Sequence, residues 1–198
     1  SEANTRAHIY DALERREVYA TSGNRIELRF FGGEGFDEST SGDELIESGY
    51  QQGVPMGHDL KPIDGNPQFL IWAKKDEFGA NLDRIQIIKG WADEDGGIYE
   101  EIFDVALSET KLKEGQEAVN LQTGEWNRNH GSEELKVVWT DEDFNPDHYS
   151  FYYVRVLEVP TGSWRLLDQV RYGHDYSDHP NLIINERAWS SPIWYSPN

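Results

Sequence analysis

The sequence contains no cysteine among its 198 residues. This absence excludes disulfide bonds, thiolate metal ligands and thiol catalysis. Long apolar runs are missing as well, since no stretch approaches the roughly 20 residues that a membrane-spanning helix needs. The first residues also lack the basic and then apolar pattern of a secretory signal. We therefore expect no membrane partner for this chain.

Positive charge is scarce, with 18 Lys and Arg against 37 Asp and Glu and a formal net charge of −19. Such a surface repels nucleic acids and anionic membranes. Aromatic residues are abundant instead, with seven Trp, ten Tyr and eight Phe. Each of these side chains buries a large area. We expect a core of aromatic and β-branched residues, and no nucleic acid among the partners.

The N-terminal residues have the pattern of an amphipathic helix. Asn4 or Thr5 can serve as the N-cap, and the apolar spacing predicts a helix over residues 5–16. That spacing places on one face Ile9, Ala12, Leu13 and Arg16. From Val18 the pattern alternates, interrupted by a Ser-Gly-Asn turn. We expect a strand, a tight turn and a second strand that ends near residue 31.

Residues 32–66 are rich in Gly, Asp, Glu, Ser and Pro, so we expect a long ordered loop at a domain seam. Residues 67–198 contain short alternating segments bounded by turn residues, which is typical of an antiparallel β-sandwich, Ig-like or jelly-roll-like. The expected strands are 69–73, 85–91, 98–107, 135–139, 149–159 and 188–195. Residues 164–172 form either a helical turn or an edge strand. The predicted fold class is mainly β, with one N-terminal helix.

Five motifs occur in order along the chain: Phe30-Phe31-Gly32-Gly33, Gly53-Val54-Pro55-Met56-Gly57, Ala80-Asn81-Leu82-Asp83-Arg84-Ile85-Gln86-Ile87, Lys89-Gly90-Trp91 and Tyr152-Tyr153-Val154-Arg155-Val156-Leu157-Glu158. They resemble the bacterial domain of unknown function 3604 family over nearly the whole chain. The segment up to Gly23 also resembles the end of the metal-dependent barrel in the polymerase-and-histidinol-phosphatase (PHP) superfamily. Residues 188–195 resemble the last strand of the β domain that follows this barrel. His58 departs from the family pattern, which has Gly there.

This resemblance implies that residues 1–31 are the C-terminal end of an upstream PHP-type barrel and that residues 67–198 are an accessory β domain. The start at Ser1, without Met, agrees with a cut inside a longer polypeptide. Proteins of that superfamily are metal-dependent, phosphoesterase-like hydrolases whose His-x-His ligands lie upstream. The resemblance therefore implies divalent metal ions in the missing barrel, and no catalytic, cofactor-binding or metal-binding residue in this chain. It also implies a bacterial protein, with a periplasmic or secreted location left open.

One acidic turn invites comparison with a calcium site. Its oxygen-bearing side chains alternate as at the start of an EF-hand loop; they are Asp141, Asp143, Asn145 and Asp147. Pro146 occupies the position where that loop needs Gly, and Tyr152 the position of its bidentate Glu. We favour a solvated turn between two strands, with calcium binding as the alternative.

A second segment offers imidazoles and carboxylates. It reads His174-Asp175-Tyr176-Ser177-Asp178-His179. Such side chains can bind zinc or a similar ion. Because they fall in an expected surface loop, we favour a structural role over a metal site.

Three arginines and one histidine are further candidates for a site. If the barrel reading holds, an arginine near its edge can bind a phosphate oxygen through paired hydrogen bonds. The alternative is that Arg15 and Arg16 end the first helix, where cations complement its dipole. We favour this alternative, while Arg25 and His58 are left without a role.

No nucleophile elbow, phosphate-binding loop or zinc-protease motif is present in the sequence. Two interpretations remain. The first is a non-catalytic accessory β domain whose partner is its own upstream barrel. The second is a stand-alone module that binds carbohydrate or a cell-surface partner, with an exposed row of Trp side chains and a calcium turn. We also expect residues 1–16 to dock on the β domain or to self-associate with a second copy.

Overall fold

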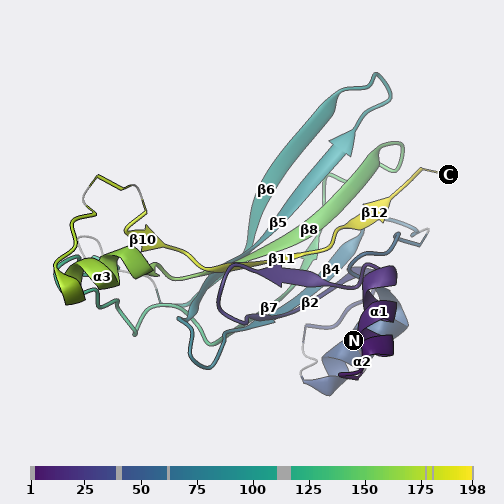
Figure 1. The fold of residues 1–198 in the computed structure, drawn as a ribbon. Helices are drawn as coiled ribbons and strands as arrows, with labels where there is room; N and C mark the ends of the chain where they lie inside the picture. Colours follow the sequence, from purple (N-terminus) through teal and green to yellow (C-terminus); the bar gives the residue numbers. More distant parts are fainter. Residues whose placement is uncertain are drawn as a thin grey trace.

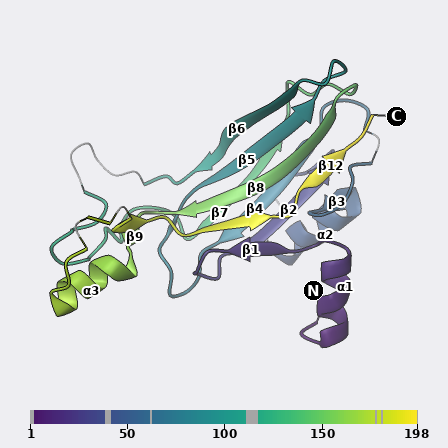
Figure 2. The ribbon, with the colours of Figure 1, turned by 45° about the horizontal axis from the view of Figure 1, so that its top comes forward.

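Two antiparallel sheets face each other in the computed structural model, which describes residues 3–38, 42–61, 63–110, 117–176, 178–179 and 181–197. Figures 1 and 2 show the sheets stacked as two layers, with helices at the two ends of the molecule. The prediction of a mainly β, antiparallel sandwich is confirmed. Within the described residues, no helix is long and apolar enough to cross a membrane.

The larger sheet has six strands in the order β1-β11-β8-β5-β6, with β12 also paired to β8. Its strands are β1 (Tyr19–Thr21), β5 (Leu82–Ala92), β6 (Ile98–Leu107), β8 (Tyr149–Glu158), β11 (Arg187–Ser190) and β12 (Ile193–Tyr195). The predicted strand over residues 188–195 is thus two strands, because Ser191 and Pro192 interrupt the pairing and Pro has no N–H to donate.

The smaller sheet has four strands in the order β3-β2-β4-β7. They are β2 (Glu27–Gly33), β3 (Gly53–Pro55), β4 (Gln68–Lys74) and β7 (Glu134–Thr140). The core lies between the two sheets and is aliphatic with a central aromatic group. In that group, Phe69 packs against Phe30, Trp139 and Tyr152, and its ring centroid lies 4.4 Å from that of Tyr152.

The first two strands do not form the expected hairpin. β1 pairs with β11 in the larger sheet, whereas β2 pairs with β3 and β4 in the smaller sheet. Residues 22–26 form an arch from one sheet to the other. The hairpin prediction is wrong because a local turn does not specify which strands pair. Residues 19–33 lie inside the sandwich, although the sequence boundary assigned residues 1–31 to a preceding domain.

The expected loop over residues 32–66 contains a helix, so that part of the prediction is wrong. Helix α2 (Asp43–Gln52) has Asp43 and Glu44 in its first turn, where acidic side chains complement the helix dipole. Its Leu45 packs with Phe31, Phe36 and Leu70 in a small second core. The helix therefore covers the outer face of the four-stranded sheet.

Helix α3 (Trp164–Tyr172) resolves the second ambiguous segment in favour of the helical alternative. Ser163 caps its N-terminus by accepting a hydrogen bond from the backbone N–H of Leu166, and Gly173 ends it in the left-handed conformation. With the short strands β9 (Thr161–Gly162) and β10 (Ile183–Ile184), α3 forms a lobe at one end of the sandwich (Figure 1).

Helix α1 (Arg6–Glu14) lies at the opposite end and starts at Thr5, whose side chain accepts from the backbone N–H of His8. Of its side chains, only Ala12 is buried. The exposed fractions of Ile9, Tyr10 and Leu13 are 44%, 63% and 57%. The helix projects from the end of the sandwich (Figure 2), so the docking alternative is not found, and pairing with a second copy stays a prediction. Helix α1 is also shorter than predicted, ending two residues before Arg16.

Candidate functional site

A groove of about 560 Å³ lies where α1 joins the sandwich. Its walls come from the residues that follow α1, from β2, from α2 and from the turn after β3. Its polar lining side chains are Arg15, Glu17, Tyr19, Arg29, Tyr50 and His58. The floor is apolar and includes Phe31 and Met56. The groove therefore combines opposite charges with aromatic rings, and four separate stretches of sequence form it.

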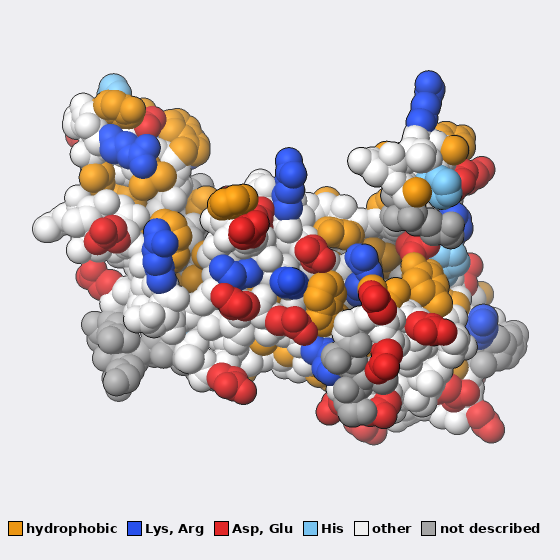
Figure 3. Space-filling model, turned by 90° about the horizontal axis from the view of Figure 1, so that it is seen from below, with side chains coloured by type: hydrophobic (Ala, Val, Ile, Leu, Met, Phe, Trp, Pro, Cys, Tyr) orange, Lys and Arg blue, Asp and Glu red, His pale blue; other side chains and the backbone are white. Residues whose placement is uncertain are grey.

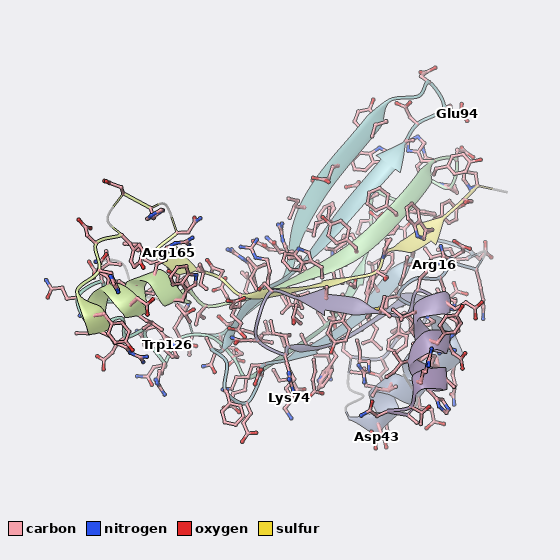
Figure 4. The ribbon with its side chains drawn as sticks, viewed as in Figure 1. Arg16, Asp43, Lys74, Glu94, Trp126 and Arg165 are labelled. Carbon is pink, nitrogen blue, oxygen red and sulfur yellow. The ribbon has the colours of Figure 1, made fainter. Side chains whose placement is uncertain are left out.

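The end of α1 fixes one wall of the groove. Arg16 has a φ of 61°, which places a non-glycine residue in the left-handed region. The backbone N–H of Arg16 donates to the Leu13 carbonyl and that of Glu17 to the Ala12 carbonyl. These two bonds form a Schellman motif, which turns the chain sharply away from the helix. Figure 4 shows Arg16 at this junction.

The turn after β3 fixes the opposite wall. Gly57 has a φ of 88°, and any Cβ there would collide with the carbonyl of Arg16. Its backbone N–H donates to the Pro192 carbonyl, and the N–H of Trp194 donates to the His58 carbonyl. The turn thus connects the four-stranded sheet to β12 of the other sheet. The backbone of His58 takes part in this connection, while its side chain lines the groove.

The charged side chains Arg15 and Glu17 in the groove form an ion pair. Arg15 pairs with Glu17 at 3.3 Å, and the Tyr50 hydroxyl donates to the other oxygen of Glu17. Burial and, after it, the neighbouring Glu17 carboxylate together raise the pKa of Tyr50 to about 12. Tyr50 therefore stays protonated at neutral pH and keeps donating. Its ring packs edge-on against Phe31, at 5.0 Å between centroids.

This arrangement suits binding better than catalysis. Both oxygens of Glu17 are already engaged, one by the Arg15 guanidinium and the other by the Tyr50 hydroxyl. In the described residues, no group of three His, Asp or Glu side chains is placed to hold a metal ion. The Arg29 guanidinium donates to the carbonyl of Leu28 through one nitrogen. A planar guanidinium has five donors, so others can meet an incoming acceptor.

The acidic turn at residues 141–147 is not built as a calcium loop. Asp141 is 1% exposed and turns inward, where its Oδ2 lies 2.6 Å from Lys89 Nζ and accepts from the Tyr152 hydroxyl. The Asp143 carbonyl accepts from the same Lys89 Nζ at 3.1 Å. Asn145 instead caps the turn by accepting from the backbone N–H of Asp147. The calcium alternative therefore loses its first ligand to a buried ion pair.

His174 and His179, in the segment that follows α3, lie on either side of an aromatic ring. Tyr176 lies between His174 and His179, with centroid distances of 5.9 and 5.8 Å, and its ring also meets Trp164 edge-on at 5.8 Å. Ser177, in the same segment, lies outside the described residues. The favoured structural role agrees with these ring contacts.

Arg25 lies in the arch after β1, whereas Arg15 and Arg16 precede β1, so β1 separates them. The backbone N–H of Arg25 donates to Asp76. Beside this arch lies Glu158, which is fully buried and which the sequence did not single out. Its Oε2 accepts from Asn24 at 2.6 Å and from the Ala80 N–H at 3.3 Å, while its Oε1 has no partner among the described residues.

Burial raises the pKa of Glu158 to about 7, against the opposing effect of its two hydrogen bonds. The nearby Glu186 and Asp76 carboxylates contribute to this rise in the pKa. A carboxyl group in this setting binds a proton near neutrality. The only sequence signal for it was its place at the end of a strand whose other side chains alternate.

Comparison with known proteins identifies the chain through its family alone. Residues 1–197 match the family described as Protein of unknown function (DUF3604). No curated protein and no solved structure matches the chain. Since the match covers nearly every residue, both the groove and the sandwich fall within it, and the chain belongs to the DUF3604 family.

Proposed function

We propose that this chain is the accessory β domain of a bacterial PHP-type metal-dependent hydrolase and is not catalytic by itself. In this role, α1 and the groove beside it receive the catalytic barrel. The observation that carries the proposal is the exposed apolar side of α1, on a helix whose ends are firmly set.

The exposed side of α1 has the properties of half an interface. Thr5 caps the start of the helix and a Schellman motif fixes its end, so its direction relative to the sandwich is defined. Nevertheless Ile9, Tyr10 and Leu13 lie largely in water. Burying each such side chain contributes roughly 1.5–3 kcal/mol. A partner that covers all three therefore gains several kcal/mol without reorganising the helix.

The groove extends this surface with polar groups. Arg15 and Glu17 lie at the end of α1, and their ion pair forms one rim of the groove. A partner that covers α1 therefore also reaches the groove. There, Arg29 and His58 supply hydrogen-bonding groups for loops of the partner or for an anionic substrate at its edge.

The proposal is tested first by the reading frame and then by association. The coding sequence upstream of Ser1 is expected to encode a barrel with His-x-His pairs. That upstream region, expressed separately, is expected to co-elute with this chain in gel filtration. Leu13→Glu should abolish co-elution, because it places a charge in the apolar contact.

Glu14→Lys is the matched control, since it changes charge on the same helix outside the apolar side. It is expected to leave co-elution intact. A frame that starts at this chain, or association that withstands Leu13→Glu, contradicts the proposal. So does metal-dependent hydrolysis of a phosphate ester by this chain alone.

A further inference from the structure

The outer face of the six-stranded sheet has no covering element among the described residues. In the other sheet, α2 and Phe36 cover the equivalent face and form a second core. Figure 2 shows β6, β5, β8 and β12 side by side with no helix across them. Side chains on this face are therefore available to a ligand.

Strand register places a row of rings on this face. Phe151 pairs with Gly90 on one side and with Trp194 on the other, and Tyr153 follows two residues along β8. The rings of Phe151 and Tyr153 are nearly parallel, at 13° and 6.4 Å between centroids. Trp194 lies 5.4 Å from Phe151 and is 40% exposed. The three rings form an aromatic platform.

Gly90 keeps this platform shallow. A Cβ at Gly90 would overlap the ring of Phe151, so this ring leans across β5 above the glycine. Ile88, next along β5 on the same face, is 1% exposed and pairs with Tyr153 and Ile102. The rings thus rest on a filled apolar layer.

A row of planar polar groups crosses the sheet beside the platform. Arg155 donates through Nε to Gln86 Oε1 at 2.8 Å, and Gln86 Nε2 donates to Asp104 Oδ1 at 2.6 Å. Register places Arg155 next to Trp189 of β11. Among the described residues, the terminal nitrogens of Arg155 have no recorded partner. They remain donors for a ligand that lies on the rings.

We propose that this face binds a neutral glycan chain. Sugar rings present C–H groups on their faces, which pack on aromatic rings, and hydroxyls at their edges, which need planar donors and acceptors such as Arg155, Gln86 and Asp104. A net charge of −19 opposes polyanionic ligands. Protein interfaces are depleted in Asp, whereas here Asp104 is part of a polar row that runs from β8 across β5 to β6.

The test is affinity gel electrophoresis of the chain in gels that contain barley β-glucan, xylan, galactomannan or starch, with alginate as the anionic comparison. At least one neutral polymer is expected to retard the chain. Trp194→Ala and Arg155→Met should each weaken retardation at least fivefold. Trp164→Ala is the matched control, because it removes a Trp that is 57% exposed on α3, away from the platform.

Melting temperatures within a few degrees of the wild type show that the variants are folded. If Trp194→Ala unfolds the chain, Arg155→Met alone decides. The proposal is overturned if no neutral polymer retards the chain, if alginate retards it most, or if only Trp164→Ala reduces retardation. These outcomes do not depend on association with an upstream domain, so this proposal and the proposed accessory role fail separately.

Discussion

At the scale of single residues, the buried Lys89–Asp141 pair holds the turn after β7 against β5. Lys89 also lies over the Trp91 and Tyr152 rings, at 5.2 and 5.9 Å. Lys89→Met leaves the Asp141 charge buried without its partner. We expect a loss of about 3–5 kcal/mol in the free energy of unfolding, measured by urea denaturation.

A double-mutant cycle checks the cause of that loss. Asp141→Asn keeps an acceptor for the Tyr152 hydroxyl and removes the charge. The double variant Lys89→Met/Asp141→Asn should therefore be more stable than Lys89→Met alone. Equal stability of the two would show that packing around Lys89, and not the unpaired charge, causes the loss.

Glu158 gives the molecule a predictable pH dependence. The pKa of Glu158 is about 7 in the folded chain, against an ordinary value of 4.5, so the folded state favours the protonated form. The contribution of Glu158 to stability is fully present below pH 4.5 and is lost as the pH rises towards 7. Glu158→Gln mimics the protonated group and should remove this loss.

Between pH 4.5 and pH 8, we expect the free energy of unfolding of Glu158→Gln to rise by about 1–3 kcal/mol relative to that of the wild type. The lower figure allows for screening by solvent. Denaturant unfolding at both pH values measures it. Glu133→Gln, an exposed control on the same chain, should show no such difference. Identical pH slopes for the wild type and Glu158→Gln would refute the assignment.

Neither buried charge could be predicted from the sequence. Alternating strands indicate which face is buried, but charged residues are almost never fully buried unless paired, so the local pattern gives no reason to place Lys89 and Glu158 in the core. Their burial depends on groups far away in sequence, such as Asp141 and Asn24. Arg15 and His58 were singled out one by one, but the groove that they share requires the turn after β3 to meet the end of α1.

At the scale of elements, the turn that follows α1 contains a residue poorly suited to its backbone conformation, Arg16, whose φ is 61°. A left-handed conformation costs a non-glycine residue roughly 1–2 kcal/mol. Arg16→Gly is expected to stabilise the end of the helix by about 1 kcal/mol, less the larger entropy that glycine gains in the unfolded chain. Hydrogen exchange of the Arg16 and Glu17 amides measures this locally, and slower exchange is the expected result.

Arg15→Gly provides the matched comparison for that prediction. Arg15 has a right-handed conformation, with φ of −74°, so glycine relieves no strain there and brings an entropic cost together with loss of the ion pair to Glu17. Faster exchange after Arg15→Gly and slower exchange after Arg16→Gly would locate the strain at Arg16. The same direction of change in both variants would contradict it.

Strands were predicted more accurately than helices because alternation is a local signal. β6 has the predicted bounds and β4, β5, β7 and β8 differ from the predicted ones by a few residues. Helix α2 was missed because its stretch is dense in Gly, Ser and acidic residues, and only Leu45 and Gly49 are buried. Gly49 allows the close approach of Phe31, which is a tertiary contact that no local pattern contains.

At the scale of the whole molecule, the arch makes residues 19–33 part of the sandwich. A chain that begins at residue 18 keeps β1 and β2 and should fold, with near-UV circular dichroism like that of the full chain. A chain that begins at residue 32 loses most of β2, including the core residues Leu28 and Phe30, and should not fold cooperatively. Equal thermal transitions for both truncated chains would show that the arch is dispensable.

The free edge of β6 affects how readily copies of the protein associate at high concentration. This strand pairs only with β5 among the described strands, so alternate residues along its ten-residue length point their backbone groups to a side without a strand partner. Such edges invite strand addition between molecules. Glu100, Glu101 and Asp104 project from it, and two copies aligned edge to edge would bring these carboxylates together. The whole chain carries a formal net charge of −19 at pH 7 and has an isoelectric point near 4.6, so the protein should be colloidally stable at neutral pH and prone to fibrillar association near pH 4.6, where its own surface no longer keeps copies apart.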